Sequence, residues 1–202
     1  MKKAPVDDRE KWNARYREEE APSPPSSFLV GLDAVLPRRG RALDVAGGTG
    51  RHALWLARRG LETTLADVSE IALEKAAAAA RREGLTLQTP QIDLLASPLP
   101  AGPWDLILCA YFLHRPLFAA FAAALAPGGW LVVAHATRSN LSRHPRPGPE
   151  YLLEDGELPT LVRDLEVIRS EEGWLESGRH EARIVARKAG GLHHSPADAS
   201  MR

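Results

Sequence analysis

The sequence has a single cysteine, Cys109, among its 202 residues. One cysteine cannot form an internal disulfide, and it excludes a zinc site built from several cysteines. An excess of charge of one sign is also lacking, because Lys and Arg total 26 and Asp and Glu also total 26. A formally neutral chain gives no electrostatic reason to expect nucleic acid or an acidic membrane surface as the main partner.

Long apolar runs are missing as well. The longest, such as residues 106–113, fall far short of the roughly 20 apolar residues that a membrane-spanning helix needs. The charged residues 1–8 lack the apolar stretch of a secretory signal. We therefore expect a cytoplasmic protein that does not associate with membranes, and no part of the sequence indicates an oligomeric state.

The composition that remains is that of an ordinary globular domain, with 44% hydrophobic and 26% charged residues. The first residues are polar and proline-rich, and residues 11–20 fit a short helix that carries Trp12 and Tyr16 on one face. The last residues have the composition of a disordered tail. We expect three segments: an N-terminal segment at 1–27, one domain at 28–188 and a tail at 189–202.

Strand and helix patterns alternate along the central part of the chain. Such alternation predicts βαβ units, and hence a Rossmann-like, doubly wound α/β sheet that is mostly parallel. The last two strands fit an antiparallel pair. The predicted strands are residues 42–46, 63–66, 85–92, 104–110, 130–134, 165–170 and 182–187, and the predicted helices are 28–36, 52–59, 70–83, 116–125 and 154–164.

Three glycines follow the first predicted strand directly, in the run Gly47-Gly48-Thr49-Gly50. Glycine accepts positive φ and lets a ligand approach the backbone, and the next helix offers free N–H groups. A tight turn without a ligand would also need glycine, but three in four positions favour a binding loop. Residues 48–53 also fit the dinucleotide pattern G-x-G-x-x-[GA]. However, the acidic Asp44 lies inside the preceding strand, where a nicotinamide enzyme usually has an apolar residue.

Acidic residues also follow the second and third predicted strands. Asp67 comes 17 residues after Gly50, and a carboxylate there can accept hydrogen bonds from the two hydroxyls of a ribose. Alternatively, Asp67 is a simple helix-start acid beside Ser69. Asp93 is placed to bind the amino group of an adenine, and an exposed loop acid would give the same pattern.

Taken together, these residues resemble the class I S-adenosylmethionine-dependent methyltransferases. The resemblance covers residues 8–188, and its nearest subgroup is the small bacterial enzymes of the tellurite-resistance and thiopurine methyltransferase types. It implies a Rossmann-like fold, S-adenosylmethionine as cofactor and a small-molecule methyl acceptor. The matching motifs are Leu-Asp-Val-Ala-Gly-Gly-Thr-Gly-Arg at 43–51, Asp67, Asp93, Ala-Pro-Gly-Gly-Trp-Leu at 126–131, Trp-Asn-Ala-Arg-Tyr at 12–16 and the segment 111–117.

The resemblance also implies roles for the matching residues. The glycine loop would face the methionine part and the ribose, Asp44 would orient the methionine end, and the segment 1–27 would cover the cofactor. Two positions depart from the pattern: Ala46, where many members have glycine, and 134–137, where the subgroup usually has an acidic residue. The implied cofactor-binding residues are Trp12, Tyr16, Asp44, Ala46, Gly47, Gly48, Gly50, Asp67, Val68, Asp93, Leu94, Cys109, Ala110 and Tyr111.

The acceptor side is less defined. Methyl transfer from a sulfonium depends mainly on alignment, and it needs a general base only when the acceptor carries a proton with a high pKa. His114 follows the fourth predicted strand and is the candidate acid or base, although a helix-start histidine held by packing fits equally well. Further candidates are Arg115, His135 and, in the loop 137–150, His144 and Arg146.

Other chemistry finds little support in the sequence. Cys109 ends a buried strand, where a cysteine is usually inert packing. The cysteine and the histidines show no metal-ligand spacing, so no metal site is predicted. Two alternatives to a methyltransferase are kept: a nicotinamide-dependent oxidoreductase, which Asp44 disfavours, and a non-catalytic protein that binds S-adenosylmethionine.

Overall fold

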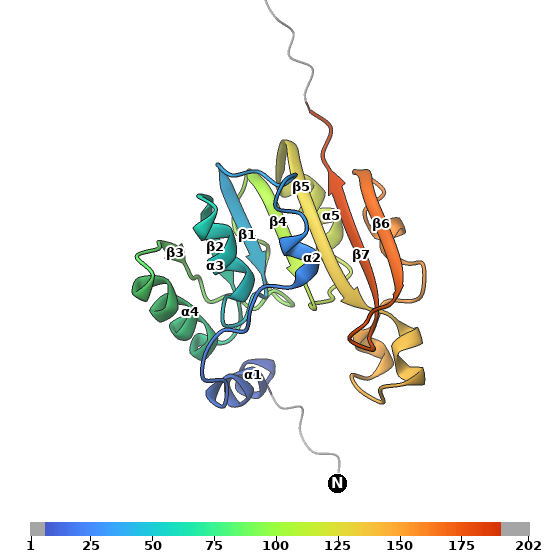
Figure 1. Ribbon diagram of the computed structural model, residues 1–202, viewed down its shortest axis with the longest axis horizontal. Helices are drawn as coiled ribbons and strands as arrows, with labels where there is room; N and C mark the ends of the chain where they lie inside the picture. The colour runs from blue at the N-terminus through green and yellow to red at the C-terminus, as the bar shows by residue number, and fades with distance from the viewer. Residues whose placement is uncertain (1–6, 191–202) are drawn as a thin grey trace, which may run out of the picture.

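A seven-stranded sheet in the order β3-β2-β1-β4-β5-β7-β6 runs through the computed structural model, which describes residues 7–190 (Figure 1). Strands β1 to β5 pair in parallel, and β7 pairs antiparallel with both β5 and β6. This topology confirms the predicted fold class. The strands are β1 (Arg41–Val45), β2 (Glu62–Ala66), β3 (Leu87–Gln88), β4 (Trp104–Ala110), β5 (Leu125–Ala136), β6 (Glu166–Trp174) and β7 (His180–Arg187).

Helices cover both faces of the sheet (Figure 1). Phe28 and Leu29 of α2 pack with Leu56 of α3 on one face, and α4 lies beside α3 on that face. Phe118 and Phe121 of α5 pack on the other face. The helices are α1 (Asp8–Arg17), α2 (Ser27–Val30), α3 (Arg51–Arg58), α4 (Glu70–Arg82), α5 (Leu117–Ala124) and α6 (Leu158–Leu161), with 3-10 turns η1 (Arg138–Ser142) and η2 (Pro149–Tyr151).

The first strand and helix show how the sequence positions the candidate site. Four of the five residues of β1 are buried, as expected for a strand that helices cover on both faces. The chain turns at the glycines, and Gly50 precedes α3 with a φ of 87°. Ser69 then caps α4, because its Oγ accepts the N–H of Ala72 at 3.1 Å. Two neighbouring βα turns therefore meet at the carboxyl edge of the sheet.

Several predicted elements differ in length from the observed ones. The strand predicted at 85–92 shrinks to Leu87–Gln88, because Pro90 cannot donate a hydrogen bond to the sheet. The helix predicted at 154–164 is limited to Leu158–Leu161, with Pro159 in its first turn. The strand predicted at 130–134 is longer, since pairing with β4 begins at Leu125 and pairing with β7 continues to Ala136.

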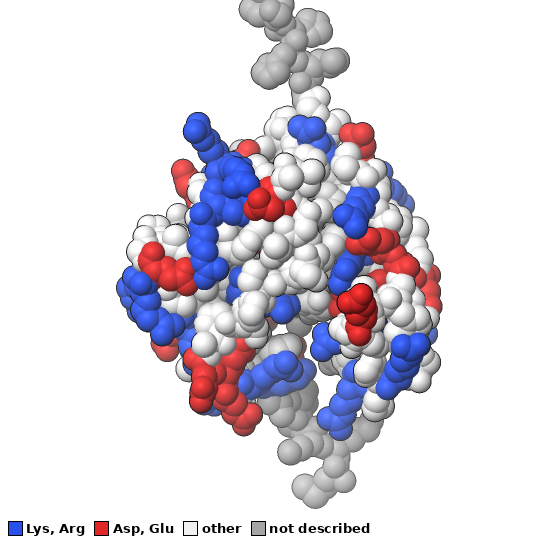
Figure 2. All heavy atoms as spheres, in the orientation of Figure 1, with Lys and Arg blue, Asp and Glu red and all other residues white. Residues whose placement is uncertain are grey.

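The surface charge of the folded chain agrees with its neutral composition. On the face drawn in Figure 2, groups of basic side chains are interrupted by acidic and uncharged ones. Within residues 7–190, no helix has the length and apolarity that crossing a membrane would require. Most of the predicted tail, residues 191–202, lies outside the described residues.

Candidate cofactor site

The glycine loop lies at the carboxyl end of β1, and its geometry requires glycine. Gly48 and Gly50 have φ angles of 58° and 87°, in the left-handed region that other residues rarely adopt. A Cβ atom on Gly47 would lie 2.5 Å from Oδ2 of Asp44, and one on Gly48 would lie 2.5 Å from Oη of Tyr16. Neither glycine can therefore be replaced without moving a neighbouring polar group.

Asp67 connects the glycine loop to the next helix. Its carboxylate is buried and accepts the N–H of Gly48 at 2.8 Å and the N–H of Ser69 at 2.9 Å. Burial raises the pKa of Asp67, and these N–H groups act in the opposite direction. The acid therefore lies directly beside the glycine loop, at the end of β2. The sequence predicted this arrangement from the parallel strands.

Asp44 is a buried acid without a partner. It is 1% exposed, and neither carboxylate oxygen has a hydrogen-bond partner within the described part of the chain. Burial raises the pKa of Asp44 from 3.8 to about 7. A buried carboxyl group without hydrogen bonds costs stability, so it is retained where a ligand or catalysis uses it. Its contact with Gly47 places this group under the glycine loop.

Helix α1 lies over the same loop. Tyr16 reaches Gly48 with its hydroxyl, and its ring stacks on that of Trp12 with 5.7 Å between the ring centroids. Burial raises the pKa of Tyr16, and the nearby Asp67 adds to the effect. The N-terminal segment that the sequence predicted as a cover therefore packs on the glycine loop.

Known proteins share these motifs and this architecture. Residues 42–129 match the family described as a methyltransferase domain. A ubiquinone biosynthesis O-methyltransferase from Alkalilimnicola ehrlichii is 34% identical over 171 residues, which cover 77% of this chain and 65% of the relative. Residues 42–129 therefore form a methyltransferase domain, and the chain resembles the class I S-adenosylmethionine-dependent methyltransferases. S-adenosylmethionine is the methyl donor of that family.

A further curated relative is also named as a methyltransferase, and a solved structure shares the fold. A demethylmenaquinone methyltransferase from Thermus thermophilus is 38% identical over 102 residues, which cover 46% of each chain. Among solved structures, TehB from Haemophilus influenzae superposes with a TM-score of 0.69 at 20% identity, over 88% of this chain and 67% of that chain. The structural likeness shows the fold. The methyltransferase spans about half to two thirds of the length of its curated relatives.

The residues of the site fit the cofactor of the family. S-adenosylmethionine carries a sulfonium and an ammonium group, and the unpartnered carboxyl group of Asp44 offers a matching acceptor. The loop from Gly47 to Gly50 has no side chain at three of its four positions, so a ligand can approach its backbone closely. Asp67 still has lone pairs for two hydroxyl donors, because each of its oxygens accepts one backbone N–H.

The predicted adenine-side residues follow β3 and lie next to Asp67. The N–H of Ile92 donates to the carbonyl of Asp67 at 2.9 Å, which brings the following residues to the edge of the site. Asp93 is exposed, and its Oδ1 accepts the N–H of Leu95 at 2.9 Å. Leu94 is buried and Val68 is half-buried. Their role at the adenine edge stays a prediction.

Of the next predicted residues, Cys109 and Ala110 end β4, and Tyr111 follows the strand directly. Cys109 is buried, its Sγ donates to the carbonyl of Phe112, and burial raises the pKa of its thiol, so it is not a reactive nucleophile. Tyr111 has a φ of 62°, and its hydroxyl donates to Oε2 of Glu181 at 3.4 Å. Ala110 is half-buried before it. Ala46, the departure from the family pattern, adopts a φ of 52° in the glycine loop.

Some acceptor-side candidates are already occupied by contacts within the protein. Arg115 donates to both carboxylate oxygens of Glu157, at 2.5 and 2.7 Å. His135 is buried and donates from Nε2 to the carbonyl of Tyr151 at 2.8 Å, and burial lowers its pKa. His144 donates from Nε2 to the carbonyl of Gly178.

His114 differs from these residues. It is half-buried three residues after Tyr111, and its ring makes no hydrogen bond within residues 7–190. Arg146 is exposed in the loop after η1, and its guanidinium makes no salt bridge within residues 7–190.

A possible group of metal ligands lies at another place, although the sequence predicted none. One ligand atom each from Asp155, Glu172 and His180 lie within 4.8 Å of one another. Both acids are exposed and accept hydrogen bonds, from Ser139 and from the N–H of Gly156 respectively. Nothing else at this position indicates a ligand, and we assign the group no function.

Sequence reasoning missed the residues that hold α1 in place and those behind Tyr111. Their signal in the sequence is weak, since each acts through a contact between distant segments. Arg51 alone could have been found, because it follows Gly50 directly, and its guanidinium lies 5.3 Å from the ring of Tyr111. The missed residues are Asn13, Glu19, Thr49, Arg51, Lys75, Glu181 and Arg183.

Proposed function

We propose that this methyltransferase transfers the methyl group of S-adenosylmethionine to a small-molecule acceptor. The unpartnered, buried carboxyl group of Asp44 at the glycine loop carries the proposal, because the cationic group of a ligand bound at that loop would supply the partner that it lacks. The bound cofactor supplies a methyl group that is already activated on a sulfonium. The protein then has to hold this group and an acceptor in line.

We propose the cofactor-binding roles that the resemblance implies, and the geometry of the site supports them. Asp44 orients the methionine end, and the backbone of Gly47, Gly48 and Gly50 lies against the methionine part and the ribose. Asp67 accepts hydrogen bonds from the ribose hydroxyls while it holds the N–H of Gly48. The remaining residues of this proposed set border the adenine, line the pocket near the sulfonium or cover the cofactor: Trp12, Tyr16, Ala46, Val68, Asp93, Leu94, Cys109, Ala110 and Tyr111.

We assign the acceptor side of the site to the segment after β4. His114 is the proposed acid or base, because it is half-buried three residues after Tyr111 and its ring makes no hydrogen bond within the described residues. It would act only on an acceptor whose proton must be removed, such as a phenol or an amine. A thiolate needs no base. Tyr111 is held by the buried carboxylate of Glu181, which pairs with Arg183 at 3.1 Å.

Two observations support a small acceptor. The ammonium of Lys11 in α1 lies 5.4 Å from the ring of Tyr151 in η2. Two segments that are far apart in the sequence therefore meet over the carboxyl edge of the sheet. The contact between α1 and η2 narrows the access of a macromolecular acceptor to the candidate site. The curated relatives are named for ubiquinone biosynthesis, demethylmenaquinone and glycine or sarcosine, which are all small molecules.

A turnover screen tests the proposal. We expect the protein to form S-adenosylhomocysteine from S-adenosylmethionine with at least one member of a panel of phenols, amines, thiols, halides and tellurite, measured by liquid chromatography. Samples without acceptor serve as the control. Turnover on protein or RNA but not on small acceptors would refute the small-molecule assignment. Binding of S-adenosylhomocysteine without turnover on any acceptor would favour a non-catalytic cofactor-binding protein.

A further inference from the structure

Helix α1 is held against the rest of the fold by polar contacts. Asn13 is its only buried residue, and Trp12 and Tyr16 are half-buried. A surface helix usually docks through a stripe of buried apolar side chains. Because α1 buries no apolar residue fully, hydrogen bonds add substantially to the contacts that hold it in position.

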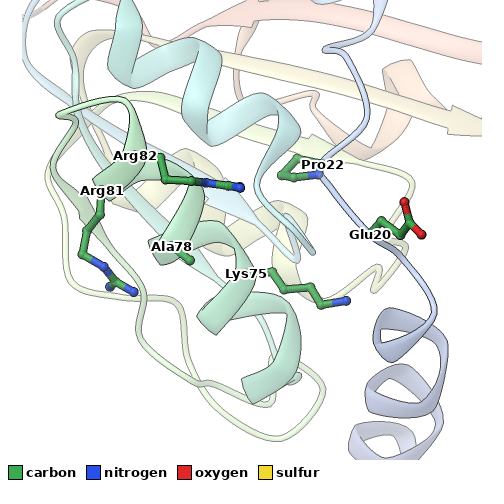
Figure 3. A pocket seen from close by; sticks show the side chains of 6 residues that line it. All are labelled: Glu20, Pro22, Lys75, Ala78, Arg81 and Arg82. Atoms are coloured by element: carbon green, nitrogen blue, oxygen red, sulfur yellow. The ribbon is translucent and has the colours of Figure 1, made fainter.

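Lys75 supplies the largest group of these hydrogen bonds. It extends from α4 toward the carboxyl end of α1, as Figure 3 shows. Its Nζ donates to the carbonyl of Tyr16 at 2.5 Å, to that of Arg17 at 3.3 Å and to that of Glu19. The last carbonyls of a helix lack regular partners, and a cation there interacts favourably with the helix dipole. All three donors of the ammonium are therefore directed at α1 and the residues that follow it.

The surroundings of Lys75 show that packing does not replace these bonds. A cavity of about 550 Å³ lies between α4 and the segment that leaves α1. This segment is therefore not packed closely on α4, and Lys75 bridges the two across the rim of the cavity (Figure 3). The lining residues are Glu20, Pro22, Lys75, Ala78, Arg81 and Arg82.

Two further bonds join α1 and the residues that follow it to the elements that form the cofactor site. Oδ1 of Asn13 accepts the hydroxyl of Ser69 at 2.6 Å, and Oε1 of Glu19 accepts the hydroxyl of Thr49 at 3.0 Å. Ser69 is bonded to Asp67, and Thr49 lies within the glycine loop. The position of α1 is thus coupled directly to the residues proposed to bind the cofactor.

We propose that Lys75 is a positioning residue that latches α1 over the cofactor site and thereby sets the rate of cofactor exchange. The hydroxyl of Tyr16 lies on Gly48, so a ligand that enters or leaves the glycine loop on this side must displace α1. Displacement breaks the three bonds of Lys75. This inference rests on the proposed function, because it assumes that S-adenosylmethionine binds at the glycine loop.

Lys75→Met tests the latch, since methionine keeps the aliphatic length and removes the donors. We expect S-adenosylhomocysteine to dissociate about tenfold faster or more from the variant, because hydrogen bonds from a charged donor are lost. Association accelerates as well, since the open form is more populated. Stopped-flow displacement of S-adenosylhomocysteine, followed by tryptophan fluorescence, measures both rates. Thermal melting of each variant separates this effect from a general loss of stability.

Two matched variants complete the experiment. Lys75→Arg keeps a cationic donor and is expected to restore slow dissociation at least in part. Arg81→Met removes a positive charge from the same helix and cavity, and Arg81 makes no hydrogen bond to α1 within residues 7–190. This control is expected to exchange the cofactor at the wild-type rate. Equal acceleration in Arg81→Met and Lys75→Met would overturn the latch, because it would indicate a nonspecific charge effect.

The outcomes separate the latch from the proposed function. A wild-type protein that does not bind S-adenosylhomocysteine contradicts the proposed function, whatever the variants do. Wild-type binding with an unchanged dissociation rate in Lys75→Met overturns the latch alone. If Lys75→Met does not fold, Asn13→Ala is used instead, because it removes the hydrogen bond between α1 and Ser69. Severalfold faster exchange is then expected, and unchanged exchange in Asn13→Ala overturns the latch.

Discussion

Asp67→Ala is expected to weaken binding of S-adenosylmethionine and S-adenosylhomocysteine at least about a hundredfold, since two charge-assisted hydrogen bonds are lost. The carboxylate is the proposed acceptor for both ribose hydroxyls. It also accepts the N–H groups of Gly48 and Ser69, so its removal loosens the glycine loop itself. Isothermal titration calorimetry on wild type and variant measures the effect.

Two further variants make the Asp67 result specific. Asp67→Asn keeps the size of the side chain and one acceptor oxygen, so we expect it to bind more weakly than wild type and more tightly than Asp67→Ala. Glu62→Gln removes an exposed acid from the start of the same strand and is expected to bind normally. Thermal melting confirms that each variant is folded at the titration temperature. Wild-type affinity in Asp67→Ala would contradict the ribose assignment.

The affinity for S-adenosylmethionine is expected to rise with pH up to about 7 and to level off above it. Burial raises the pKa of Asp44 to about 7, so the free protein carries a proton there at lower pH. Binding of the cationic methionine end favours the ionised carboxylate and releases this proton. The dissociation constant should therefore fall by about tenfold per pH unit below the pKa. Calorimetry between pH 5 and 8 measures the trend.

Asp44→Asn isolates the contribution of this group. The amide resembles the protonated acid, so we expect the variant at high pH to bind as weakly as wild type does at low pH. Any pH dependence that remains belongs to other acids, including Asp67, whose pKa burial also raises. A wild-type affinity that is independent of pH would contradict the role of Asp44.

The same burial has a second consequence for the cofactor-free protein. Between the ordinary pKa of 3.8 and the folded value of about 7, the folded state keeps a proton that the unfolded chain has lost. The contribution of Asp44 to the free energy of unfolding is therefore greatest at low pH and decreases as pH rises through this range. Asp44→Asn is expected to remove this decrease, which denaturant unfolding at several pH values measures.

The sequence was informative where a local pattern determines the structure. The strand predicted at 104–110 has the observed bounds of β4, because its residues are mostly apolar and become buried between two layers of helices. The glycine loop was predicted because φ angles such as that of Gly50 restrict the residue type. The position of Asp67 beside the loop followed from two parallel neighbouring strands.

Contacts between distant segments could not be predicted in this way. Lys75 lies in an alanine-rich helix, and nothing near it in the sequence indicates that its ammonium binds the end of α1. The same holds for Glu181, which reaches Tyr111 only because β7 folds back beside β5. Strand and helix ends were also missed where pairing or proline decides them, as in β3. The fold was thus more predictable than the contacts that complete its site.

Calorimetric titration of the wild-type protein with S-adenosylhomocysteine, S-adenosylmethionine and NADH tests the central claim most directly. The account predicts saturable, micromolar binding of both adenosyl ligands and no binding of NADH in the same range. Preference for NADH, or no binding of either adenosyl ligand, would contradict the assignment of the glycine loop, Asp44 and Asp67 as a cofactor site for methyl transfer.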